Sequence, residues 1–293
     1  MELKQLYYFL QLSKDKNFSK ASKNLYFTQQ ALSKAIKRLE DELGVDLFIR
    51  SSSGVELSVY GEYFLEKATL IVNEIDETIN EIKRQSKQEK AKLHVGFTFG
   101  SMSALNLDKI FKFEKNNPDI VLAINEYPDT VCEQMLNEGA LDIACVVAPI
   151  NTKIFNYATL LIEPLYLMIS NKNSLAFKNY ITMEDIKNEK FLAVNETFNA
   201  PKSLIHICNK AGFSPNIIFT SPETFLLQEM ARHNKGIYLI PEHAMSSVNQ
   251  KDVVFKLFPD AELTWKICLI TNKSKPLTFP AKKFYEYLLE ITN

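Results

Sequence analysis

Apolar residues recur at helical spacing through the first forty residues of the chain. The first stripe comprises Leu3, Leu6, Tyr7 and Leu10. It predicts an amphipathic helix that ends near residues 15–17, because this spacing places apolar side chains on one face of a helix. A second, short helix is predicted over residues 20–25, with Ser19 as its N-terminal cap.

A third helix is predicted after Thr28, whose hydroxyl is a typical N-cap, and before Gly44, which tolerates a left-handed helix end. Its apolar face comprises Ala31, Leu32, Ala35, Ile36 and Leu39. Its opposite face carries amides, a hydroxyl and ammonium groups on Gln29, Gln30, Ser33, Lys34 and Lys37. Two helices joined by so short a turn have the form of a helix-turn-helix that reads base edges in DNA.

A short β-hairpin is predicted next. Residues 45–50 and 55–57 flank a small polar turn over residues 51–54, the pattern of a wing. The net charge of −1 conceals a local excess of basic residues: seven lie between residues 14 and 38, against the single acid Asp15. Such a run also suits a solvated helix face, so only its place on a DNA-reading helix favours nucleic acid as the partner.

A long amphipathic helix is predicted after Ser58. Its apolar positions alternate by four and three residues and comprise Gly61, Leu65, Ala68, Val72, Ile75, Ile79 and Ile82. This alternation is typical of a heptad seam, so we expect the helix to pair with a second copy. The alternative is that the stripe packs on its own domain. Residues 83–90 lack large apolar side chains and are interpreted as a hinge.

Short apolar runs alternate with helical segments through the rest of the chain. The runs cover residues 93–97, 120–125, 142–147, 165–170, 191–194, 217–219, 237–240 and 266–271. Such alternation predicts an open, mainly parallel α/β sheet. In sheets of this kind, ligands bind beyond the carboxyl ends of the strands.

Composition limits the class of protein further. Hydrophobic residues make up 46% and charged residues 24% of the 293 residues, as in ordinary globular proteins. The chain shows neither a signal-peptide pattern at its start nor a run of about twenty apolar residues, so we expect no membrane partner and a cytoplasmic location. Four scattered cysteines suit reduced thiols, and no second cysteine lies near Cys208 in the sequence to support a redox role. The histidines at 206, 233 and 243 are too dispersed for a metal site, and no cofactor is expected.

Three other function classes are less consistent with the sequence. An enzyme is disfavoured because nucleotide-binding, nucleophile-elbow and zinc-protease motifs are absent. A solute-binding protein would explain the sheet-rich part and leave the helix-turn-helix without a role. A purely architectural DNA binder would leave the large α/β part without a function.

The N-terminal sixty residues closely resemble the LysR-type transcriptional regulators. The resemblance rests on FSKA at residues 18–21, TQQALS at 28–33 and LGVDLF at 43–48. Softer similarities follow in GALDIA at 139–144, EPL at 163–165 and GIYLIP at 236–241. The resemblance implies a sequence-specific DNA-binding regulator, a homodimer or homotetramer, controlled by a small-molecule effector.

The resemblance also implies a domain organisation. A winged helix-turn-helix is expected over residues 1–58, a linker helix and hinge over 59–90, and an effector domain over 91–293. The effector domain is expected to be a two-lobed α/β fold like the periplasmic binding proteins. Lobe I would cover 92–161 and 266–293, and lobe II would cover 162–265.

Candidate contact residues follow position by position from the resemblance. For DNA they are Ser19, Thr28, Gln29, Gln30, Ser33, Lys34, Lys37, Arg50, Ser51 and Ser53. Gln30 stands where the family usually has proline, and Ala35 where a long polar side chain is frequent, so we expect an altered base preference.

For the effector, residues from both lobes are expected to meet in the cleft. They are Thr98, Phe99, Gly100, Ser101, Met102, Ser103, Thr130, Asn195, Glu196, Thr197 and Phe198. The hydroxyl groups in this set suit a small carboxylate, whereas Glu196 suits an amino compound, so both kinds of effector stay open.

Overall fold

The computed structural model describes residues 1–51, 54–86 and 90–292, with the backbone alone described at 50, 51, 81 and 84–86. The chain divides into two compact units, Met1–Glu89 with Lys273–Pro276 and Lys90–Asn272 with Leu277–Asn293. Ser53 and part of the expected hinge lie outside the described residues. Within the described ranges, none of the helices combines the length and apolarity needed to cross a bilayer.

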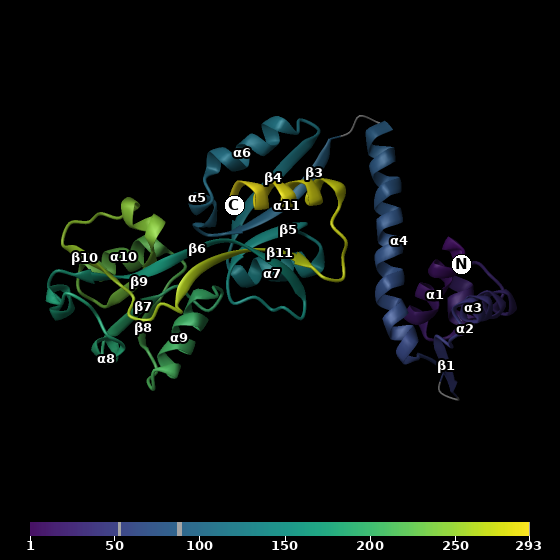
Figure 1. The fold of residues 1–293 in the computed structure, drawn as a ribbon, viewed down its shortest axis with the longest axis horizontal. Coiled ribbons are helices and arrows are strands. Elements are labelled where there is room, and N and C mark those ends of the chain that lie inside the picture. Colours follow the sequence, from purple (N-terminus) through teal and green to yellow (C-terminus); the bar gives the residue numbers. More distant parts are fainter. Residues whose placement is uncertain (52–53, 87–89, 293) are drawn as a thin grey trace. The chain divides into compact units, whose positions relative to one another are not determined.

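The first unit contains three short helices, a two-stranded wing and a long helix (Figure 1). In order they are α1 (Leu3–Asp15), α2 (Phe18–Asn24), α3 (Gln29–Leu43), β1 (Phe48–Ser51), β2 (Gly54–Leu57) and α4 (Val59–Ser86). The predicted ends of α3 are confirmed, because Thr28 accepts the Ala31 N–H at 3.2 Å and Gly44 has a φ of +72°. Ser19 was wrongly predicted as the cap of α2. Asn17 caps it by accepting the Lys20 N–H, since the helix begins one residue before Ser19.

One buried carboxylate and a group of aromatic rings hold the wing against the helices. Glu40 of α3 accepts the N–H groups of Leu47 at 2.9 Å and Phe48 at 3.1 Å. The ring of Phe9 in α1 lies 5.1 Å from that of Phe48 and 4.9 Å from that of Phe64 in α4. The apolar faces of all these elements therefore share one core, which leaves the polar face of α3 at the surface.

Helix α4 packs on its own unit through the first half of the predicted seam. Ala68 and Val72 are buried against this unit's core, and Gly61 passes so close to the wing that a Cβ would meet the Leu47 carbonyl oxygen at 2.1 Å. The prediction that the whole seam pairs with a second helix is therefore wrong for this half. At the other end, Ile79 and Ile82 are exposed.

The second unit consists of two lobes built on one continuous sheet (Figure 1). Its strands are β3 (Ala91–Thr98), β4 (Ile120–Tyr127), β5 (Ile143–Val147), β6 (Phe155–Ser170), β7 (Lys190–Ala193), β8 (Asn216–Thr220), β9 (Ile237–Pro241), β10 (Val253–Leu257) and β11 (Thr264–Asn272). Lobe I has the strand order β4-β3-β5-β11-β6. Lobe II has the order β10-β6-β9-β7-β8.

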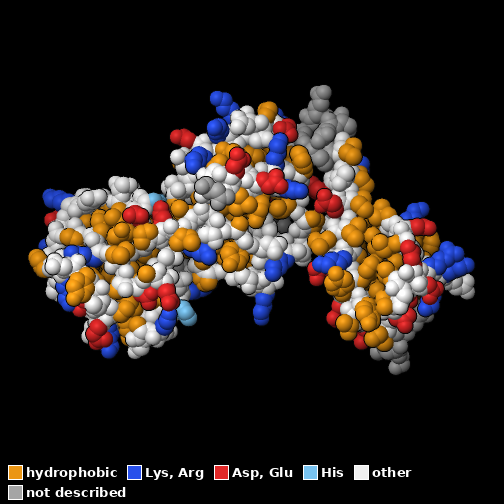
Figure 2. All heavy atoms as spheres, in the orientation of Figure 1, with side chains coloured by type: hydrophobic (Ala, Val, Ile, Leu, Met, Phe, Trp, Pro, Cys, Tyr) orange, Lys and Arg blue, Asp and Glu red, His pale blue; other side chains and the backbone are white. Residues whose placement is uncertain are grey.

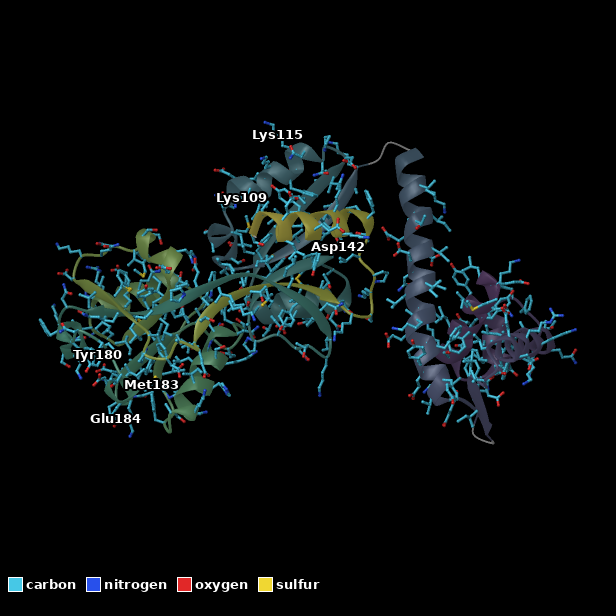
Figure 3. The ribbon with its side chains drawn as sticks, in the orientation of Figure 1. Lys109, Lys115, Asp142, Tyr180, Met183 and Glu184 are labelled. Atoms are coloured by element: carbon cyan, nitrogen blue, oxygen red, sulfur yellow. The ribbon has the colours of Figure 1, made fainter. Side chains whose placement is uncertain are left out.

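Helices and turns connect these strands and cover both faces of the sheet. They are α5 (Ser101–Ala104), α6 (Leu107–Asn116), α7 (Asp129–Glu138), η1 (Ser174–Phe177), α8 (Met183–Ile186), α9 (Ala200–Lys210), α10 (Thr224–Arg232), η2 (Glu242–Ser247) and α11 (Phe279–Thr292). In lobe I, α6 and α11 lie on one face, where the rings of Phe113 and Phe284 are 4.9 Å apart, and α7 lies on the other (Figure 1). Tyr180, Met183 and Glu184 lie at the end of lobe II that is remote from lobe I (Figure 3).

Strand β6 joins the two lobes by changing its partner. Residues 155–164 pair with β11, whereas residues 165–170 pair with β9 and β10. The sequence predicted this strand only from residue 165, because Pro164 interrupts the apolar run. Pro164 lies where the β11 ladder ends, a position where a missing N–H donor costs little.

Two further sequence predictions about the sheet need correction. The strand β10 was not predicted, although Val253–Leu257 is a short apolar run. The sheet is mixed rather than mainly parallel. The pairs of β3 with β4 and β5, and of β7 with β8 and β9, are parallel, but every pair formed by β6 or β11 is antiparallel.

Candidate DNA-contacting surface and ligand cavity

The polar face of α3 forms a shallow surface depression. Its lining comprises Thr28, Gln29, Gln30, Ser33, Lys34, Lys37, Arg38 and Asp41. Six of these residues belong to the predicted DNA-contacting set, so the helix brings them to one surface. Arg38 was not assigned to that set, although its position one turn after Lys34 places it on the same side of the helix.

The basic groups of this surface differ in their availability. Lys37 lies 3.2 Å from Asp41 and 3.7 Å from Asp46, and hydrogen bonding to Asp41 raises the pKa of the lysine. Lys34 and Arg38 form no ion pair with the described residues. These two side chains are therefore the cations that a phosphate or a base edge would meet unopposed.

Ser19 connects α2 to the reading helix. Its hydroxyl donates to Oε1 of Gln29 at 2.8 Å, which turns the amide NH₂ of Gln29 away from α2. This bond gives Ser19 a positioning role through Gln29. The side chains of Arg50 and Ser51 on the wing lie outside the described atoms. Tyr26, in the turn before α3, is almost fully exposed, and the sequence interpretation did not include it among the candidate DNA contacts.

The second unit contains a cavity of about 290 Å³ whose walls come from both lobes. Lobe I contributes Thr98, Phe99, Gly100, Asp129, Val147 and Ala148. Lobe II contributes Leu165, Leu192, Ala193, Val194, Phe198, Ala200, Pro201, Ser203, Leu204, Thr224, Gln228, Tyr238, Leu239, Ile240, Pro241, His243 and Ala244. The segment that returns to lobe I adds Leu263, Thr264 and Trp265.

Only part of the predicted effector set lines this cavity. Thr98, Phe99, Gly100 and Phe198 do, and the rings of Phe99 and Phe198 face each other from opposite lobes at 5.9 Å. The other predicted residues are absent from the cavity wall: Ser101, Met102, Ser103, Thr130, Asn195, Glu196 and Thr197. Ser101 is buried and donates to the Thr98 carbonyl, while Ser103 and Glu196 are exposed.

Beside the cavity, several hydrogen bonds join the lobes directly. The backbone N–H and the hydroxyl of Thr130 both donate to the Thr197 carbonyl, at 3.1 and 3.0 Å. Asn199 of lobe II donates from Nδ2 to the carbonyls of Val147 at 2.9 Å and Pro149 at 3.3 Å, and to Glu133 at 3.1 Å. The predicted residues Thr130 and Thr197 therefore bind each other.

Asp129 lies where the two lobes meet beside the cavity, and its pKa is shifted from the ordinary value. Its two carboxylate oxygens accept the N–H groups of Val147 at 2.8 Å and Asn199 at 2.9 Å, one from each lobe. Burial raises its pKa to about 6, although these two N–H groups and the nearby Thr98 hydroxyl lower it. That hydroxyl is close to the carboxylate but finds no partner in hydrogen-bonding geometry.

In another part of the cavity wall, His243 is paired with a carboxylate and stacked on an aromatic ring. Its Nδ1 lies 2.6 Å from Oε2 of Glu163, and its ring lies 4.7 Å from that of Trp265. Sequence reasoning missed His243, Tyr238, Gln228 and Trp265, because they lie on different elements, η2, β9, α10 and β11, which only the fold brings together. The four cysteines are free and buried, and burial raises the pKa of Cys208 to about 11, which disfavours a reactive thiolate.

Both units match one family in sequence. Residues 3–62 match the family described as bacterial regulatory helix-turn-helix protein, lysR family, and residues 86–292 match the LysR substrate binding domain. The uncharacterised regulator YwbI of Bacillus subtilis is 30% identical over 98% of this chain and 95% of its own length. The regulator AlsR of the same organism is 28% identical over 94% of this chain and 93% of its own.

Solved structures agree with this match at the level of the fold. Full-length CbnR in complex with its target DNA has a TM-score of 0.55 at 19% identity, with both chains covered completely. A hydrogen-peroxide-bound OxyR mutant of Corynebacterium glutamicum has a TM-score of 0.61 at 19% identity, over 99% of this chain and 92% of that one. The chain belongs to the LysR family of DNA-binding transcription regulators, which are not enzymes.

Proposed function

We propose that α3 reads an operator sequence in the major groove of double-stranded DNA. The observation that supports this most directly is the separation of faces on α3: Leu32, Ile36 and Leu39 are buried, while the polar residues share one open surface. Gln29 is suited to pair with a base edge, and Lys34 and Arg38 to bind phosphate or guanine. Because double-stranded DNA is the proposed partner, we also propose that the protein acts in the cytoplasm.

We propose further that the cavity between the lobes binds a small-molecule effector. Its walls come from both lobes, so a ligand there would contact both. Such a ligand would shift the equilibrium between open and closed arrangements of the two lobes. The expectation of a carboxylate rested on a cluster of hydroxyl groups, and that of an amine rested on Glu196. Neither Glu196 nor the hydroxyl residues Ser101, Ser103, Thr130 and Thr197 line the cavity. The chemistry of the effector therefore has to be inferred from the residues that do.

A homodimer, alone or as half of a tetramer, is the assembly that we propose. The C-terminal half of α4 leaves apolar side chains without cover from its own unit, and hydrophobic atoms lie along this helix (Figure 2). The exposed residues comprise Ile79 and Ile82. In such a dimer, one helix-turn-helix would bind each half-site of the operator. Once the first is bound, the second binds effectively intramolecularly, which raises the overall affinity.

Selection of genomic fragments by the purified full chain tests the proposal. We expect the retained fragments to share a sequence with two related half-sites, because each protomer of a dimer presents the same α3. A matched selection with Lys34→Ala should recover the same sequence more weakly. Retention of fragments without any shared sequence would contradict the proposed operator reading and favour an architectural role.

A further inference from the structure

The residues around the inter-lobe cavity point to a ligand class that differs from the expected one. We infer that the cavity binds an uncharged cyclic or aromatic molecule that carries a hydroxyl or carbonyl group. This inference rests on the proposed function, in which the cavity is the effector site. It adds the chemistry that the effector must have.

The described part of the cavity wall offers no free cation to an anionic ligand. Neither lysine nor arginine occurs among the described residues that line the cavity. The one candidate cation is His243, and Glu163 already lies 2.6 Å from its Nδ1. A carboxylate in this cavity would lose its hydration without gaining a counter-charge, which is unfavourable in an apolar site.

The backbone at the start of α9 does not replace the missing cation. Helix N-termini bind anions through free N–H groups. Here Pro201 has no N–H, and the N–H groups of Lys202 and Ser203 donate to the carbonyl of Asn199. These three positions in the first turn of α9 therefore offer no free N–H to an anion.

An ammonium ligand fits no better. The carboxylate in the wall belongs to Asp129, which is 1% exposed and uses both oxygens to accept backbone N–H groups from the two lobes. A ligand cation would have to compete with these bonds, which hold the lobes together. Glu163 is occupied by His243.

The polar groups that remain free are neutral. The Thr98 hydroxyl is not among them, because it is fully buried beside the Asp129 carboxylate. The Tyr238 hydroxyl and the Gln228 amide line the cavity, and neither forms a hydrogen bond with the described residues. Hydroxyl and carbonyl groups are the ligand atoms that such side chains bind without a charge.

The remaining wall favours a ring. Phe99 and Phe198 approach from opposite lobes, and Trp265 also lines the cavity, with the His243 ring beside it. Aliphatic side chains such as Leu192, Val194 and Ile240 fill the space between them. Flat aromatic faces and a volume of about 290 Å³ suit a small ring system better than an extended chain.

Matched probes that differ only in charge test this inference on the full-length chain. One series comprises 2-phenylethanol, phenylacetate and 2-phenylethylamine, and a second comprises indole-3-ethanol, indole-3-acetate and tryptamine. We expect the neutral member of at least one series to bind at least tenfold more tightly by calorimetry than its acid and amine. Tighter binding of an acid or amine, or no binding by either alcohol, would overturn the inference.

Two variants connect the affinity to the cavity. Gln228→Met should lower the affinity for the neutral probe about fivefold, because it removes an amide that would bind the hydroxyl or carbonyl group of the ligand. Tyr238→Phe should lower it similarly, whereas the control Tyr180→Phe, at the remote end of lobe II, should not (Figure 3). Unchanged affinity in both cavity variants would place the probe elsewhere and overturn the inference.

The proposed function can fail separately from this inference. If an acid or amine binds and changes the affinity for operator DNA, the cavity is an effector site and only the neutral class is wrong. Ala193→Phe, which fills the cavity, then provides the second readout. Unchanged effector response of DNA binding in this variant would contradict the effector role of the cavity itself.

Discussion

At the scale of single residues, Gln29 is the side chain best placed to determine base preference. Its amide is oriented by Ser19 and lies on the exposed face of α3. We expect Gln29→Ala to weaken operator binding by about 1–3 kcal/mol while affinity for random DNA changes little, because only a base contact depends on sequence. Fluorescence anisotropy on both DNAs measures this difference.

Two controls separate orientation from contact in that experiment. Lys34→Ala should weaken binding to both DNAs, since a phosphate contact is independent of sequence. Ser19→Ala should reproduce a smaller part of the Gln29→Ala effect, because it removes only the bond that orients the amide. Equal losses on both DNAs for Gln29→Ala would show that it is not a base reader.

A second residue-scale prediction concerns Asp129. Its folded-state pKa of about 6 exceeds the ordinary value of 3.8, so the folded chain retains a proton that the unfolded chain releases. Stability from this group is therefore lost as pH rises between these values. Relative to Asp129→Asn, which does not titrate, the parent should lose about 1 kcal/mol of unfolding free energy between pH 5 and 7.

Urea unfolding of parent and variant across that pH range checks this slope. Asp129→Asn also places an NH₂ group opposite one of the two backbone N–H donors, which lowers stability at every pH. The raised pKa is therefore tested by how the difference in unfolding free energy between parent and variant changes with pH. A constant difference, or one of opposite slope, would contradict the raised pKa.

The limits of the sequence interpretation are also visible at this scale. The reading face of α3 follows from one period of 3.6 residues, so local spacing was enough to predict it. The cavity residues Gln228, Tyr238 and Trp265 belong to α10, β9 and β11, and only the fold brings them together. The hydroxyl groups in the sequence predicted contacts with the effector. In the structure, however, the Thr130 hydroxyl donates to the Thr197 carbonyl of the other lobe, which the sequence could not show.

At the scale of elements, α4 has two faces with different roles. The period of the seam was read correctly as helical, yet sequence alone did not show that Ala68 and Val72 would be covered by the unit's own core. The remaining exposed isoleucines are candidates for the contact between protomers. The same reasoning explains β6, where Pro164 interrupts the pattern at the point at which the strand changes partner.

The double variant Ile79→Asp with Ile82→Asp tests this division of α4. Both side chains are exposed, so we expect the monomer fold to persist while like charges facing each other split the dimer. Light scattering should then report about half the parent mass. The control Asn80→Asp adds one charge on another side of the helix and should leave the mass unchanged. An unaltered mass in the double variant would exclude this stretch from the protomer contact.

At the scale of the whole molecule, the coupling between ligand and DNA has to begin with the arrangement of the two lobes. The bonds formed by Asn199 with Val147, Pro149 and Glu133 join the two lobes beside the cavity. A preformed cavity reduces the conformational entropy that binding must overcome. Removing these bonds should therefore weaken ligand binding although Asn199 is absent from the cavity wall.

Asn199→Ala makes that argument measurable. We expect a loss of roughly 1–3 kcal/mol in unfolding free energy of the second unit, because the Val147 and Pro149 carbonyls lose their Asn199 donor. The neutral probe should bind several-fold more weakly by calorimetry, and fragment selection should still recover the parent operator, since α3 belongs to the other unit. Asn209→Ala, near the exposed C-terminal end of α9, is the matched control, because this side chain accepts the Ser214 hydroxyl within lobe II. If Asn199→Ala lowered stability but left the affinity for the probe unchanged, the closed arrangement of the lobes would contribute to folding alone, and the ligand would not depend on it.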